Sequence, residues 1–166
     1  MANFGMKITL FPFFRMKIKF VLAVFVWALM VFGQHSFAQE MIDGVYHISS
    51  VEDLKSFAER VNNGENTANA ILTCDLDLDN KPHTPIGSNE SPYMGHFDGG
   101  THSVSNIIIY NTSLSQLGFF GTIGGGCVIE NLIIASGRIQ GNKACAGLVG
   151  ACRGNAGSLI KIINCG

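Results

Sequence analysis

The sequence predicts an all-β solenoid that begins with a short capping helix. From Gly95 onward the chain is rich in Gly, Asn and runs of Ile, Leu and Val, without an amphipathic helix or a long linker. This part also repeats itself. The segment S-V-S-N-I-I-I, ending at Ile109, resembles V-I-E-N-L-I-I, ending at Ile134, and G-F-F-G at Gly118 returns as G-L-V-G at Gly147. Repeated short strands separated by variable loops are typical of a solenoid.

Three asparagines mark the repeats. Asn106 and Asn131 stand in the two matching segments, and Asn164 stands in the weaker match I-K-I-I-N-C. A period of about 20 to 50 residues suits a solenoid, because one turn cannot bury its apolar side without the next. The alternative is an antiparallel sandwich joined by hairpins. Hairpins would not explain why the same motifs return in the same order.

The first 38 residues resemble a secretory signal peptide. A 13-residue apolar run covers Phe20–Phe32, shorter than the roughly 20 residues that span a membrane. Ser36 and Ala38 are small residues at the positions that precede signal cleavage, so we expect the exported chain to begin at Gln39. An uncleaved anchor helix is the alternative. The run is preceded by the cations Lys7, Arg15, Lys17 and Lys19, and Met16 would serve as an alternative start.

The exported part, 39–166, is long enough for one domain with a sizeable core. Four of the 11 cations lie in the leader, which leaves 7 cations against 12 acids and a net charge near −5. This acidity argues against nucleic acid as a partner. The five cysteines form no C-x-x-C motif and most are expected to pack as small apolar residues. Cys145 and Cys152 are the closest pair and the one candidate for a disulfide.

Residues 39–94 predict an N-terminal strand–helix–strand cap, and 95–166 the solenoid repeats, which we expect to continue past the end of this sequence. A strand over 44–48 precedes a helix that starts with a Ser49–Glu52 capping box and stops at Gly64. Residues 68–80 follow as a single half-buried strand with an acidic outer face. Its inward residues are Ala70, Leu72, Cys74, Leu76 and Leu78, and the apolar face of the helix is Val51, Leu54, Phe57, Ala58 and Val61.

The order of these motifs resembles the GLUG-motif family of bacterial surface proteins, a solenoid also found beside some immunoglobulin-A metallopeptidase modules. G-L-V-G at 147–150 nearly spells the motif, and the approach from D-G-V-Y-H-I through L-T-C-D-L-D-L, T-P-I-G and G-H-F-D-G-G-T-H also matches. The resemblance covers about residues 43–166. It implies a right-handed parallel β-helix with an N-terminal cap, secreted or at the cell surface.

The segment F-D-G-G-T-H at 97–102 contains the most conspicuous candidate for chemistry. We interpret it as a corner in which Phe97 points into the core, Asp98 accepts a hydrogen bond from the turn, and both glycines are free to adopt positive φ. The family usually has a glycine where Thr101 stands. His96 and His102 lack zinc-binding spacing and H-E-x-x-H is absent, so the peptidase activity of some relatives does not carry over.

No catalytic, cofactor-binding or metal-binding residue is assigned, and the chain is not expected to be an enzyme. Asp75 and Asp77 could hold calcium on an outer strand face, but solvated carboxylates that protect an edge explain them as well. We expect an adhesin-like or structural surface protein that binds a host or cell-surface glycan or protein, or acts as a spacer. The alternative is a carbohydrate-active β-helix lyase or hydrolase. It would require Asp98, Glu130, Arg138 and Lys161 to line one groove.

Overall fold

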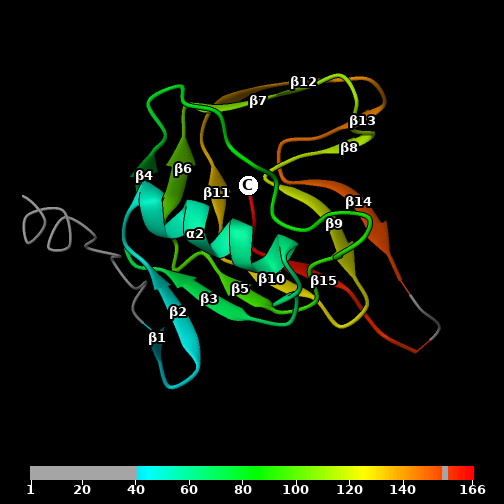
Figure 1. Cartoon of the computed structure of the whole chain (residues 1–166). Helices are drawn as coiled ribbons and strands as arrows, with labels where there is room; N and C mark the ends of the chain where they lie inside the picture. The colour runs from blue at the N-terminus through cyan, green and yellow to red at the C-terminus, as the bar shows by residue number, and fades with distance from the viewer. Residues whose placement is uncertain (1–40, 155–156) are drawn as a thin grey trace, which may run out of the picture. The chain divides into compact units, whose positions relative to one another are not determined.

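The computed structural model describes residues 41–154 and 157–166. The chain divides into two units, 1–38 and 39–166, and the predicted signal segment with its cleavage point lies outside the described residues. The second unit is a parallel β-solenoid of about three turns with one short helix, as the repeats predict (Figure 1). Within the described residues, no helix is long and apolar enough to cross a bilayer.

One sheet, called the main sheet below, receives a strand from every turn. Its order is β1-β2-β3-β5-β10-β15, and all neighbours are parallel except the β1–β2 hairpin. Parallel stacking allows the backbone N–H and C=O groups of each turn to form hydrogen bonds with those of the next turn. The strands are β1 Met41–Ile42, β2 Val45–Ile48, β3 Asn69–Leu72, β5 His96–Asp98, β10 Val128–Glu130 and β15 Lys161–Ile163.

The remaining strands form the other walls of the solenoid, and they also pair in parallel with the turn above or below. A three-stranded sheet has the order β11-β6-β4, and three two-stranded sheets pair β12 with β7, β13 with β8 and β14 with β9. The strands are β4 Leu76–Asp77, β6 Ser103–Ser105, β7 Ile107–Asn111, β8 Gln116–Leu117, β9 Phe120–Gly124, β11 Ile133–Ile134, β12 Gly137–Gly141, β13 Ala144–Cys145 and β14 Val149–Arg153.

Helix α2, Val51–Asn62, forms where the apolar spacing predicts it, but its cap is shifted by one residue. Ser50, with extended backbone at φ −148°, accepts a hydrogen bond from the N–H of Asp53 at 3.1 Å. The Asp53 carboxylate accepts in return from the N–H of Ser49. The predicted Ser49–Glu52 capping box is therefore wrong, because Asp53 and not Glu52 reaches back across the first turn.

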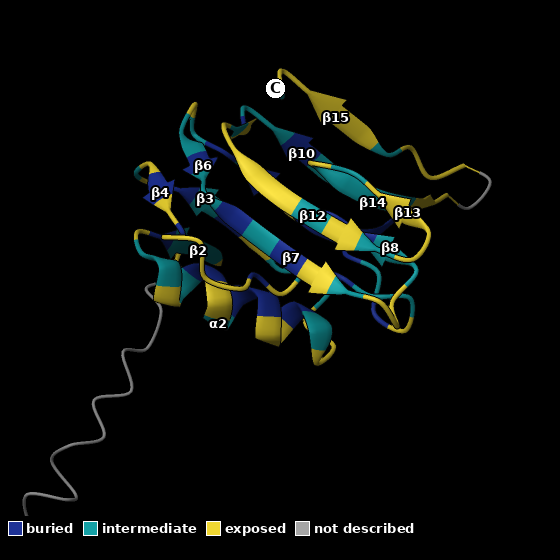
Figure 2. Ribbon diagram, turned by 90° about the horizontal axis from the view of Figure 1, so that it is seen from above, coloured by how far each residue is buried: buried dark blue, intermediate teal, exposed yellow. Residues whose placement is uncertain are grey.

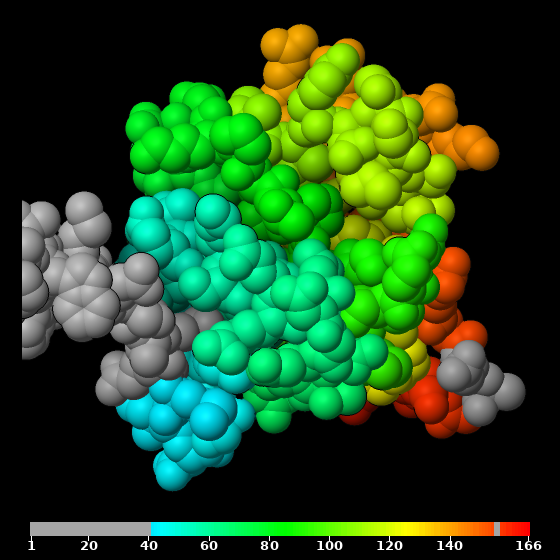
Figure 3. Space-filling view, in the orientation of Figure 1, coloured from blue at the N-terminus to red at the C-terminus, as the bar shows by residue number. Residues whose placement is uncertain are grey.

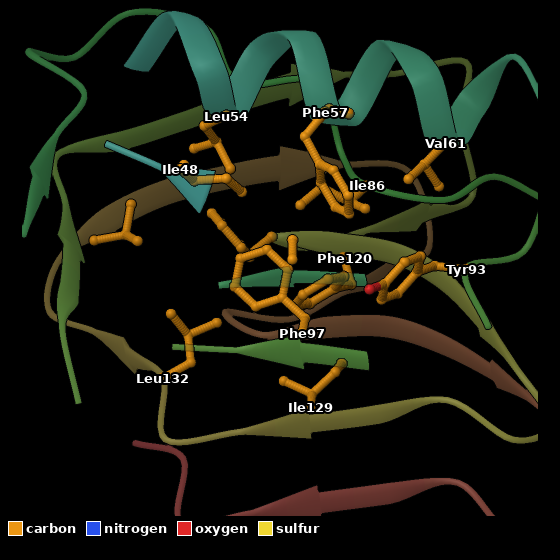
Figure 4. Close-up of a cluster of buried hydrophobic side chains, with 14 of the residues drawn as sticks. Ile48, Leu54, Phe57, Val61, Ile86, Tyr93, Phe97, Phe120, Ile129 and Leu132 are labelled. Carbon is orange, nitrogen blue, oxygen red and sulfur yellow. The ribbon is translucent and has the colours of Figure 1, made fainter. Parts of the chain in front are cut away.

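The helix packs on an aromatic core inside the solenoid (Figure 4). Phe57 contributes the central contact from α2, with its ring centroid 5.9 Å from that of Tyr93 and 6.0 Å from that of Phe97. Phe97 also packs edge-on against Phe120 at 5.2 Å. These four side chains are fully buried, so the helix closes the core at the start of the solenoid.

The first turn of the solenoid lies within the segment predicted as the cap. The single strand predicted over 68–80 is wrong, because the chain turns a corner after Leu72 and places β3 and β4 in different sheets. The inward alternation persists through the corner, since Leu72, Leu76 and Leu78 are all buried. Bridges from Pro82 to Ile108, Ile86 to Phe120 and Tyr93 to Ile123 complete this turn.

The repeats stack with a register that differs in part from the sequence match. G-F-F-G and G-L-V-G do stack, since Phe120 pairs with Val149. Asn106 and Asn131, however, do not occupy equivalent corners. Asn131 follows β10 and leads out of the main sheet, whereas Asn106 separates β6 from β7 and stacks beside Ser136. All three marker asparagines still adopt positive φ, between 51° and 56°, as expected for residues at tight corners.

Candidate functional site

Asp98 lies at the end of β5, where the chain leaves the main sheet. Its Oδ1 accepts a hydrogen bond from the N–H of Gly100 at 2.9 Å and another from the Asn131 side chain of the next turn at 3.0 Å. Asn164 in turn donates to the Asn131 side-chain oxygen at 3.0 Å. Phe97 beside it is fully buried. The predicted corner is confirmed, and Asp98 begins a side-chain ladder that binds successive turns together.

The two glycines of this corner have different roles. Gly100 takes φ +58°, as predicted, but the second positive φ belongs to Thr101 at +65°. Gly99 instead permits close approach, because a Cβ there would clash with the carbonyl oxygen of Asn131. The prediction of positive φ at both glycines is therefore wrong for Gly99. The bend is displaced onto Thr101, a β-branched residue that rarely adopts this conformation.

The outer face of the main sheet carries a histidine–carboxylate pair. His96 and Asp98 point outward because Phe97 between them is buried, and Glu130 pairs in register with Asp98. The His96 Nε2 atom lies 2.7 Å from the Glu130 Oε1 atom. The pair bridges two turns at a partly exposed position, so imidazole and carboxylate are close enough to exchange a proton.

A shallow hollow lies beside this pair, on the part of the main sheet formed by β1, β2, β3 and β5. Its volume is about 470 Å³, within the range of small-ligand sites. Both histidine and carboxylate groups reach it. It is lined by Ile42, Asp43, Val45, His47, Asn69, Ala70, Ile71, His96 and Asp98.

The four residues of the enzymatic alternative do not all share one groove. Asp98, Glu130 and Lys161 belong to strands of the main sheet. Lys161 pairs with Val128 and is two positions from the residue that pairs with Glu130. Arg138 lies on β12, in the sheet formed with β7. The structure thus brings two carboxylates together and places the guanidinium on another wall.

The acidic strand around Asp75 and Asp77 binds neighbouring backbone. Asp75 accepts from the N–H of Ser103 at 2.7 Å, and this bond lowers the pKa of its carboxyl below 3.8. Asp77 accepts from the N–H of Asp79 at 2.8 Å and from the Asn106 side chain at 2.8 Å, with the same effect on its pKa. Across residues 41–154 and 157–166, no group of three or more His, Cys, Asp or Glu side chains is arranged to hold a metal ion.

His102 and the cysteines complete the set of predicted candidates. The Nδ1 atom of His102 lies 3.5 Å from the Asp75 Oδ1 atom of the preceding turn. Cys145 and Cys152 are exposed, lie on different walls and are not bonded to each other. Cys127 is buried, and burial raises the pKa of its thiol to about 12, which removes it as a nucleophile at neutral pH.

His83 is a buried titratable residue that the sequence did not single out. Its side chain is 8% exposed, its Nε2 atom lies 3.2 Å from the Phe119 carbonyl oxygen, and its ring stacks on that of Phe119 at 4.9 Å. Burial lowers its pKa from 6.5 to about 4. The residue follows Pro82 in a segment without clear alternation, so only the pairing of Pro82 with Ile108 places it inward.

Comparison with known proteins finds similarity over about half of the chain. The chain is 34% identical over 84 residues to a protein of Evansella cellulosilytica named "Putative Gly-rich membrane protein". The match covers 51% of this chain and 10% of that protein, so the chain spans about a tenth of the relative's length. No family model matches the chain, and no solved structure matches it.

Proposed function

We propose that this chain is an exported, adhesin-like surface protein that binds a partner through the outward faces of its solenoid and performs no catalysis. One observation carries the proposal. Asp98, the most conspicuous candidate for chemistry, has its Oδ1 atom engaged by the Gly100 N–H and the Asn131 side chain. A carboxylate whose oxygen accepts hydrogen bonds within a chain corner is poorly placed to transfer a proton to a substrate.

The proposed location rests on the leader and on the relative. Residues 1–38 have the cation-then-apolar order of a secretory signal. The relative is named as a membrane protein, and the match covers only 10% of it. A solenoid of surface type, with flat walls open to solvent, suits binding or spacing outside the cell. The resemblance to GLUG-motif surface proteins agrees with this proposal.

The test separates binding from turnover. Purified full chain is immobilised, and retention of labelled animal and bacterial cells, soluble polysaccharides and surface proteins is measured. The same polysaccharides are analysed for shortened products after incubation with the chain. We expect retention of at least one class and no shortening. Shortening by the wild-type chain that disappears in Glu130→Gln would contradict the proposal.

A second function deserves the same test because of the His96–Glu130 pair. The two groups lie 2.7 Å apart, and His96 lines a hollow of about 470 Å³. A carboxylate beside an imidazole could act as a base in a lyase or hydrolase acting on carbohydrate. This alternative predicts that His96→Gln and Glu130→Gln abolish turnover alike, whereas Lys143→Gln, at an exposed position between β12 and β13, leaves it intact.

A further inference from the structure

The outward face of the β7–β12 sheet carries side chains that the fold does not use. On β7, Ile107 and Ile109 are 0% and 2% exposed, so the residues that alternate with them point outward. Across the sheet, Arg138 pairs with Ile108, and Gln140 pairs with Tyr110. We call these four outward residues the Tyr110 strip: Ile108, Tyr110, Arg138 and Gln140. They line a depression of about 270 Å³ together with Ile109.

The aromatic ring of Tyr110 is open to solvent. Its exposed fraction is 66%, and it is the one aromatic residue among the large exposed hydrophobic side chains of the described chain. The phenylalanines of the core and Tyr93 are fully buried, and Tyr46 packs against the core. Figure 2 shows β12 mostly exposed next to the alternating β7. Nothing in the described fold requires an uncovered ring at this position.

Arg138 is equally unengaged. Elsewhere in the described chain, Arg60 binds Glu65 and Arg153 donates to the Asn89 carbonyl oxygen. Arg138 is exposed and takes part in none of the ion pairs or side-chain hydrogen bonds found across residues 41–154 and 157–166. Its guanidinium is therefore free to bind an external group.

The surrounding charge favours an anion. Residues 101–166 contain four cations and one acid, Glu130, whereas 39–100 contain three cations and 11 acids. Glu130 belongs to the main sheet, on another wall from Arg138, and is paired with His96. Residues near 110 and 140 lie together along the top of the space-filling view (Figure 3). The first turn borders this strip where Pro82 pairs with Ile108, and its nearby charges, Asp79 and Lys81, pair with each other. A protein that is acidic as a whole thus presents a locally positive strip.

We propose that the Tyr110 strip binds a carboxylated saccharide. The CH-rich face of a sugar ring stacks on Tyr110, the guanidinium of Arg138 pairs with the sugar carboxylate through two parallel hydrogen bonds, and the Gln140 amide binds a hydroxyl. Neighbouring strands lie about 4.8 Å apart and successive outward residues about 7 Å apart, so the strip spans one or two sugar rings. This inference rests on the proposed partner-binding function and names its ligand class.

A saccharide fits this face better than a protein partner does. Protein interfaces rely on aromatic or arginine anchors that are buried in well-packed pockets with apolar surroundings. Here one ring stands on a flat wall, the depression is shallow, and the other contacts are planar polar groups. Such a surface complements a ring that has one apolar face and a polar rim.

The experiment uses polygalacturonate and its methyl-esterified form as probes, because the two differ in carboxylate charge and share the sugar. Binding to the full chain is measured by calorimetry for the wild type, Arg138→Gln, Tyr110→Ala and Lys161→Gln. Lys161→Gln is the matched control, since it removes the same charge from the exposed β15 on another wall. Circular dichroism melts verify that every variant is folded.

We expect the wild type to bind polygalacturonate at least tenfold more tightly than the esterified form. Arg138→Gln should abolish this preference, Tyr110→Ala should weaken both probes, and Lys161→Gln should change neither by more than about twofold. Equal losses in Arg138→Gln and Lys161→Gln would reveal nonspecific charge attraction and overturn the proposal. No binding of either probe would also overturn it. Retention of cells or proteins with no saccharide binding would leave partner binding intact and remove only this ligand.

Discussion

Stability should fall steeply between about pH 6.5 and about pH 4 because of His83. The folded chain holds this imidazole neutral, since its ring is buried and stacked on Phe119 with a pKa of about 4. The unfolded chain binds a proton near the ordinary value of 6.5. Between these two values the unfolded state carries more protons, so the free energy of unfolding decreases as the pH falls.

The size of this effect follows from the shift. A difference from 6.5 to about 4 corresponds to a full loss of about 3 kcal/mol, at about 1.4 kcal/mol per pKa unit. Roughly 2 kcal/mol of this loss should appear between about pH 7.5 and about pH 5. Asp75 and Asp77 also lose stabilising hydrogen bonds in acid, but their pKa values lie below 3.8. Their contribution is therefore lost mainly below about pH 5, outside the range between about pH 7.5 and about pH 5 that the assay compares.

The assay is urea unfolding of the wild type, His83→Phe and His83→Leu at about pH 7.5 and about pH 5. Neither variant titrates at this position, and the Phe119 carbonyl retains its bond from the N–H of Ile86 at 3.0 Å. Both should lose about 2 kcal/mol less than the wild type on acidification. His47→Gln, on the main sheet, should behave as the wild type does. Identical pH dependence in the wild type and both His83 variants would refute a buried neutral imidazole.

Three further predictions concern the corner and the leader. Thr101→Gly should stabilise the fold by about 0.5–1 kcal/mol. Relief of the left-handed conformation at this position outweighs the greater flexibility that glycine gives the unfolded chain. Thr112→Gly, at a position of ordinary φ, should destabilise the fold in the same melts. Asp98→Ala should lower the free energy of unfolding by about 1 kcal/mol and Asp98→Asn by less, because only Ala removes the acceptor of the turn N–H. Equal losses in the two variants, or melts that respond to calcium in the wild type alone, would contradict a purely structural role. Intact mass of the exported chain should correspond to a start at Gln39, and any residue before Ala38 would contradict the predicted cleavage.

Local patterns were sufficient to predict several elements of the fold, although not the corner after Leu72. The apolar spacing of 51–61 correctly placed α2, and the G-x-x-G recurrence correctly paired the turns at Phe120 and Val149. The corner at Asp98 was also predictable, because Asp followed by two glycines has few other uses. These features depend on residues close in sequence, where propensity and turn chemistry act directly.

Register between turns could not be read from the same patterns. Asn106 and Asn131 are followed by nearly identical apolar runs, yet they occupy different corners. Ser103 pairs with Ile133, so the main-sheet strand β10 lies under β5 and not under β6. Which strands pair depends on the number of residues in each loop, and the G-x-x-G and Asn motifs carry no information about loop length. The inward placement of His83 could not be predicted for the same reason, since it depends on the pairing of Pro82 with Ile108, 26 residues later.

The polar residues that attracted attention in the sequence are those that the fold itself uses. Asp75, Asp77 and Asp98 each accept a hydrogen bond from a backbone N–H, and two of them also bind an asparagine of the next turn. Asp and Asn residues at chain corners recur in every turn of the solenoid, so a search for sequence motifs finds them first. Tyr110 belongs to no motif, and Arg138 was considered only as a member of another groove. Their proximity becomes visible only when β7 and β12 lie in register. In a solenoid, therefore, candidate binding residues are better sought among outward side chains that neither a corner nor a neighbouring turn engages.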